Sequence, residues 1–154
     1  MTPIPRLRDY DGPAILSYGF RPFFLLGAIY SACAVFIWLA IFSGDAALPT
    51  EFAARDWHVH EMLFGFLSAV IAGFLLTAVP NWTGRAPLRG IPLLALWLLW
   101  LTGRFCLVVP IGSPLAVAAL DASFLIALAS LLWAKARTSM KFVGTRCDEK
   151  HPKT

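Results

Sequence analysis

The chain has 154 residues, of which 58% are hydrophobic and only 14% are charged, and its formal net charge is +4. An ordinary soluble domain carries roughly 25% charged residues, so the composition excludes that class and indicates an integral membrane protein that contacts the lipid bilayer. The basic residues lie between and beyond the apolar runs, which is typical of membrane proteins and argues against nucleic-acid binding.

Residues 1–21 are polar and predict a short lead-in at the membrane surface. After it, four apolar runs of about the length that crosses a bilayer predict four transmembrane helices, over residues 22–42, 60–80, 91–111 and 113–134. Residues 135–154 are polar and basic and predict a tail. The fold class is therefore all-α, a polytopic bundle segment in which residues 22–134 form the membrane region.

The second run is the most informative part of the chain. Met62–Val79 contains no charged residue, and at about 1.5 Å per residue it covers roughly 27 Å, close to the thickness of a hydrocarbon core. Pro80 and Gly84 predict its end. Along it, small residues recur at every fourth position, and they predict a stripe for close packing of another helix: Gly65, Ala69, Gly73 and Thr77.

The distribution of Lys and Arg predicts the orientation. Three precede the first span, one lies in the acidic loop at residues 43–56, two follow the second span, none lies between the third and fourth spans, and six lie in the tail. Because positive segments stay in the cytoplasm, both termini should be cytoplasmic, and the histidine end of the second span should face the other side.

Two charges lie inside the last two apolar runs. Arg104 precedes Gly112 by eight residues and Asp121 follows Ser113 by eight, so in an antiparallel hairpin both lie about 12 Å below the same surface. A charge at membrane depth costs at least about 2.5 kcal/mol and usually has a reason. Three interpretations remain open: a buried ion pair, an Arg104 contact with a cofactor carboxylate, or proton transfer through Asp121.

His58 and His60 stand at the entrance of the second span, with Glu61 and Met62 behind them. On a continuous helix, side chains at i and i+2 point about 200° apart, so the two histidines would not chelate one metal unless the helix began near His60. Imidazole is a good ligand for haem iron and copper, and Met is a softer one. The alternative is that both histidines are interfacial polar residues and that Glu61 favours a helix N-terminus.

Long strings of the sequence resemble the N-terminal part of the NnrS family. They are SYGFRPFFLLG (Ser17–Gly27), WHVHEMLFGF (Trp57–Phe66) and GFLLTAVPNWTGR (Gly73–Arg85), supported by LTGR (Leu101–Arg104) and ALD (Ala119–Asp121). The resemblance extends from about Pro13 to Trp133. It covers only the N-terminal third of the family, and residues 135–154 are expected to be unlike it.

The resemblance implies a multi-pass protein of the bacterial inner membrane that binds haem and copper and is linked to nitric oxide metabolism and to resistance against nitrosative stress. By the same resemblance, His58 and His60 become the candidate haem or copper ligands, with Met62 a weaker one. Glu61 is implied as a neighbour in a cofactor site, and Arg104 as a partner of a haem propionate. The implied small ligand is nitric oxide or a similar molecule.

Other functions stay open. No nucleophile–base pair or phosphate loop is recognisable, so no catalytic reaction is predicted. A transport or proton-relay protein that uses Arg104 and Asp121 is the first alternative. Because the family carries further spans, the chain is also expected to be a truncated product, either without activity or completed by the missing C-terminal helices or a second chain.

Overall fold

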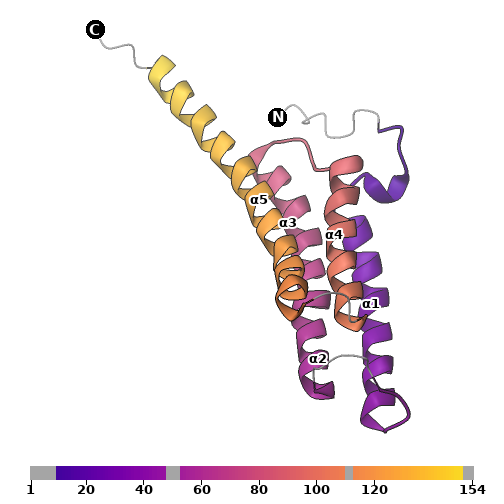
Figure 1. Cartoon of the computed structure of the whole chain (residues 1–154). Helices are drawn as coiled ribbons and strands as arrows, with labels where there is room; N and C mark the ends of the chain where they lie inside the picture. Colours follow the sequence, from indigo (N-terminus) through magenta and orange to yellow (C-terminus); the bar gives the residue numbers. More distant parts are fainter. Residues whose placement is uncertain (1–9, 48–52, 110–112, 151–154) are drawn as a thin grey trace.

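The computed structural model describes residues 10–47, 53–109 and 113–150, with side chains described as far as Arg137. All the described elements are helical, which confirms the predicted all-α class (Figure 1). In chain order they are η1, a 3-10 helix (Ala14–Leu16), α1 (Phe20–Phe42), α2 (Ala54–His60), η2, a π-helix (Glu61–Leu67), α3 (Ser68–Thr83), α4 (Ile91–Val108) and α5 (Pro114–Lys150).

Within the described residues, four helices are long and apolar enough to cross a membrane, and they confirm the four predicted spans. They cover Phe20–Phe42, Ala54–Thr83, Ile91–Val108 and Pro114–Arg137. Parts of several predictions lie outside the described residues, namely 1–9 of the lead-in, 48–52 of the acidic loop, 110–111 of the third span and 151–154 of the tail.

The second span differs from its prediction at both ends. It begins at Ala54 rather than at residue 60, so His58 and His60 both lie on helix and neither lies in an incoming loop. It also continues through Pro80 to Thr83. Pro80 removes one hydrogen bond inside this helix without ending it, and the helix stops where Gly84 takes the left-handed conformation, with φ of 68°.

The small residues of α3 pack closely against α1, as the stripe predicts. A Cβ built on Gly27 of α1 would lie 3.2 Å from the Cβ of Ala69, and one built on Gly73 would lie 2.7 Å from the ring of Phe24. Small side chains let two helix backbones approach each other, and dispersion contacts then hold the pair together in a lipid environment.

A small apolar core lies between the four spans. Phe23 of α1, Leu76 of α3 and Trp100 of α4 are all buried, and Phe124 of α5 lies 5.8 Å from Phe23 between ring centroids. Many other large apolar side chains remain exposed, such as Phe36 at 72%. This pattern is that of helices whose outer faces contact lipid tails.

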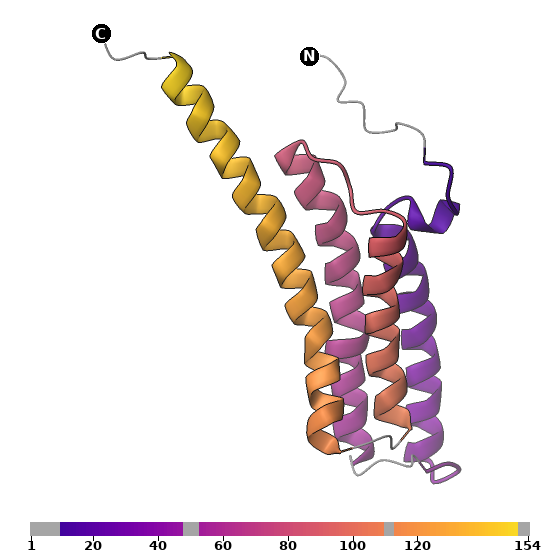
Figure 2. The same cartoon turned by 45° about the horizontal axis from the view of Figure 1, so that its top comes forward.

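One end of the bundle carries the lead-in and the loop after α3, and the other end carries α2 (Figure 1). At one end, Gly90 N of the loop after α3 donates a hydrogen bond of 3.0 Å to Leu16 O, so the lead-in contacts the bundle. Lys135 Nζ donates to Ala86 O of the same loop at 3.0 Å. Beyond this point α5 continues as helix into the predicted tail and turns away from the other helices (Figure 2). The histidines lie toward the opposite end, in α2.

Candidate functional site

A cluster of polar side chains lies inside the bundle, where the junction of α2 and η2 faces α1, α4 and α5. We call the charged cluster the group Tyr30, His60, Glu61, Arg104 and Asp121. Its centre is Glu61, whose side chain is completely buried at the first residue of η2. In a π-helix the backbone bonds run between residues five apart, and such segments are frequent at functional sites.

Two donors satisfy one oxygen of Glu61. Its Oε2 accepts a hydrogen bond from the hydroxyl of Tyr30 on α1 and another, at 2.9 Å, from Nη1 of Arg104 on α4. Arg104 is itself only 3% exposed. An unpaired buried carboxylate or guanidinium costs several kcal/mol of stability, so each of these two charges offsets the cost of burying the other.

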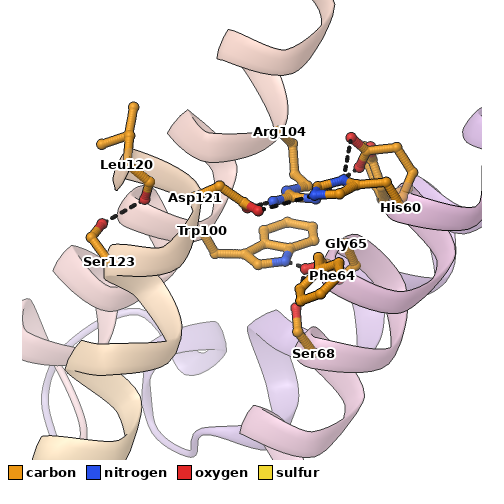
Figure 3. Close-up of polar contacts among 11 residues, drawn as sticks. His60, Phe64, Gly65, Ser68, Trp100, Arg104, Leu120, Asp121 and Ser123 are labelled. Atoms are coloured by element: carbon orange, nitrogen blue, oxygen red, sulfur yellow. Dashed lines mark hydrogen bonds and ion pairs between the residues drawn. The ribbon is translucent and has the colours of Figure 1, made fainter. Parts of the chain in front are cut away.

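Asp121 brings α5 into the charged cluster. Its carboxylate contacts Nη2 of Arg104, so this guanidinium lies between Glu61 on one side and Asp121 on the other. Figure 3 shows Arg104 reaching between Asp121 and the His60 side of the site. The two charges that the sequence placed at one depth are thus in direct contact.

His60 completes the charged cluster from the last residue of α2. Its Nε2 lies 3.2 Å from Oδ2 of Asp121 (Figure 3). Its Nδ1 lies 3.7 Å from Oε1 of Glu61. The ring also stacks on Phe64 with 4.8 Å between centroids. Both ring nitrogens therefore face carboxylates.

Gly65 and Trp100 form the floor of the charged cluster. The indole Nε1 of Trp100 donates to Gly65 O at 3.0 Å (Figure 3). The ring of Trp100 also meets the ring of Tyr30 edge-on, with 5.5 Å between centroids. A Cβ on Gly65 would lie 2.8 Å from the ring of Tyr30 and 2.9 Å from Glu61 Oε2. Only a residue without a side chain leaves room here for these partners.

His58 lies apart from the charged cluster. Its ring stacks on Trp38 of α1, with 4.4 Å between centroids and 22° between planes. Its Nδ1 is buried and has no hydrogen-bond partner, and the same is true of Nε1 of the neighbouring Trp57. A buried imidazole nitrogen without a partner is a ligand candidate, because burial without a bond costs free energy.

The remaining predicted site residues occupy different places. Met62 is half-buried at the start of η2. Arg104, expected to meet a haem propionate, has Nη1 and Nη2 engaged by carboxylates, while its Nε has no hydrogen-bond partner. The sequence did not identify Tyr30 as a site residue, although a hydroxyl within an uncharged span is a signal that it needs a partner.

The comparison with protein families identifies the family to which this chain belongs. Residues 14–144 match the family described as NnrS protein. The chain belongs to the NnrS family. With its four apolar spans it is a multi-pass membrane protein of that family. The match includes residues 135–144, in the segment that was expected to be unlike NnrS proteins. Comparison with curated proteins and with solved structures gave no significant match.

The NnrS resemblance implies haem and copper, and the described side chains fit these groups only in part. Among them, no three His, Cys, Asp or Glu residues lie together in a way that could hold a metal ion. His58 offers a buried nitrogen without a hydrogen bond, whereas both nitrogens of His60 face carboxylates. The described part of the chain therefore fits a site with one histidine ligand from α2, and it does not form a closed metal centre.

Proposed function

We propose that this NnrS protein is a haem- and copper-binding protein of the bacterial inner membrane, linked to nitric oxide metabolism and to resistance against nitrosative stress. Family membership supports the class of cofactor, and the buried, unpartnered Nδ1 of His58 is the observation that supports the site. When bound, haem iron or copper supplies a centre that takes up a small diatomic ligand such as nitric oxide. No turnover reaction is assigned.

In this proposal His58 holds the metal and its neighbours shape the surroundings. Trp38 covers one face of the imidazole ring and restricts its rotation, since the two rings are stacked. Met62 stands one helical turn beyond His58 and is the weaker ligand candidate. A second chain that stays bound during purification would supply the further ligands and the rest of the haem pocket.

We also propose the orientation that the basic residues favour. Arg85 and Lys135 belong to the end of the bundle where Lys135 binds the loop after α3, and this end would face the cytoplasm. The end that carries α2, with His58 and His60, would face the opposite side (Figure 1).

The test is the visible absorption spectrum of the chain, purified from membranes of cells supplied with haem, together with its copper content. We expect a Soret band in the parent protein and its loss in His58→Ala, because the ligand is gone. His151→Ala removes a histidine of the tail and is the matched control, which should keep the band. A colourless parent, or a His58→Ala variant with the parental spectrum, would contradict the proposal.

A further inference from the structure

We infer that the two histidines of α2 have different tasks: His60 is a positioning residue that ties α5 to the end of α2 through Asp121, and His58 alone is the metal ligand. The part that concerns His58 rests on the proposed function. The part that concerns His60 rests on contacts within the protein and holds without any metal.

The contacts of His60 argue against ligation. Its Nε2 lies 3.2 Å from Asp121 and its Nδ1 lies 3.7 Å from Glu61, so a metal on either nitrogen would have to displace a carboxylate. A metal that displaced Asp121 or Glu61 would also pull that carboxylate away from the buried Arg104, which lies inside a candidate membrane span, where an uncompensated charge is expensive. Metal binding at His60 would thus weaken the contacts that hold the helices together.

The geometry of the helix separates the two side chains. Both histidines lie on α2, and residues two apart on a helix point in nearly opposite directions. His58 accordingly stacks on Trp38 of α1, while His60 reaches Asp121 of α5. One metal cannot draw both imidazoles together without unwinding the last turn of α2.

The charged cluster links His60 to the position of His58. Asp121 is held by Arg104, and Arg104 is held by Glu61, which follows His60 in the chain. These contacts join α5 and α4 to the junction of α2 and η2. Because His58 stands on the helical turn just before that junction, His60 and Asp121 fix the turn on which the proposed ligand is carried.

The experiment uses the full chain in detergent and compares His58→Ala, His60→Ala and His60→Gln. The first readout is the melting temperature of the metal-free protein. We expect His60→Ala to lower it, and His60→Gln to recover part of the loss because the amide can still donate to Asp121. His58→Ala should lower it less than His60→Ala does, because it removes one ring stacked on Trp38 and no contact with a carboxylate. The double variant His60→Ala/Asp121→Asn should melt no lower than the less stable of its two single variants, because the partners act together.

The second readout is the spectrum after loading with haem. We expect His58→Ala to lose the Soret band, and His60→Ala to keep it with a shifted maximum that His60→Gln moves back toward the parent. Two results would overturn the inference: equal melting temperatures for parent and His60→Ala, or loss of the band in both His60 variants at full metal-free stability. A parent without a band would reject the proposed function. The melting temperatures would still test whether His60 ties α5 to the end of α2.

Discussion

Replacing Gly65 by alanine tests whether the floor of the charged cluster is as closely packed as the contacts indicate. The added Cβ would lie 2.8 Å from the Tyr30 ring, 2.9 Å from Glu61 Oε2 and 3.3 Å from Arg104 Cδ. Two of these distances are shorter than side-chain contacts normally are, so the ring and the carboxylate have to move. Their movement would disturb the hydrogen bonds that Glu61 receives from Tyr30 and Arg104.

The expected magnitude follows from two opposing effects. Overpacking of a well-filled site costs about 1–3 kcal/mol. Alanine in place of glycine inside a helix contributes about 1 kcal/mol of stability in the other direction. Gly103→Ala on α4 is the matched control, because its Cβ would lie 3.4 Å from Asp121 Oδ1, an ordinary contact. The pair should thus differ in free energy of unfolding by about 1–3 kcal/mol.

Tryptophan fluorescence during unfolding in mixed detergent micelles measures this difference, since Trp100 packs directly on the site. Gly65→Ala should unfold at a lower fraction of denaturing detergent than Gly103→Ala. Equal stability of the two variants would refute the close approach of the Tyr30 ring and the Glu61 carboxylate to Gly65.

Two further predictions concern the charged cluster and the orientation. Tyr30→Phe removes a donor to the buried Glu61 carboxylate and should cost about 1.5–3 kcal/mol of stability in the same assay, whereas Tyr18→Phe near the other end should cost little; equal losses would show that the hydroxyl contributes nothing. In a cysteine-free background, Ala46→Cys should react with a membrane-impermeant maleimide on intact cells, and Ala86→Cys only after the cells are opened. The reverse pattern would invert the proposed topology.

The spans were predictable because hydropathy and length act on whole segments. The start of the second span was not, since Arg55 and Asp56 are charged and suggested a loop, while the structure continues the helix back to Ala54. Membrane thickness limits how much of a helix is apolar, and it does not limit how far a helix extends beyond the lipid. The same reasoning explains why α5 runs on as helix past the apolar run that ends near residue 134.

The pairing of charges was only half predictable. The positions of Arg104 and Asp121 along an antiparallel hairpin give their common depth, which needs only the rise per residue. The burial of Glu61 and its contact with Arg104 were not predicted, because an expected helix start at residue 60 made Glu61 a charge at the helix N-terminus. Its burial and its contact with Tyr30 depend on how α1 is rotated about its axis and on the π-helical register of η2, and a single sequence fixes neither.

The charged cluster also limits how an anionic cofactor can approach. Nη1 and Nη2 of Arg104 already contact the carboxylates of Glu61 and Asp121, and its buried Nε has no hydrogen-bond partner. A haem propionate on that nitrogen would place a third carboxylate against one guanidinium in a site of low dielectric, where like charges repel strongly. If His58 holds a haem as proposed, Arg104 is therefore not expected to bind its propionates, and Arg104 would instead hold the helices together through Glu61 and Asp121.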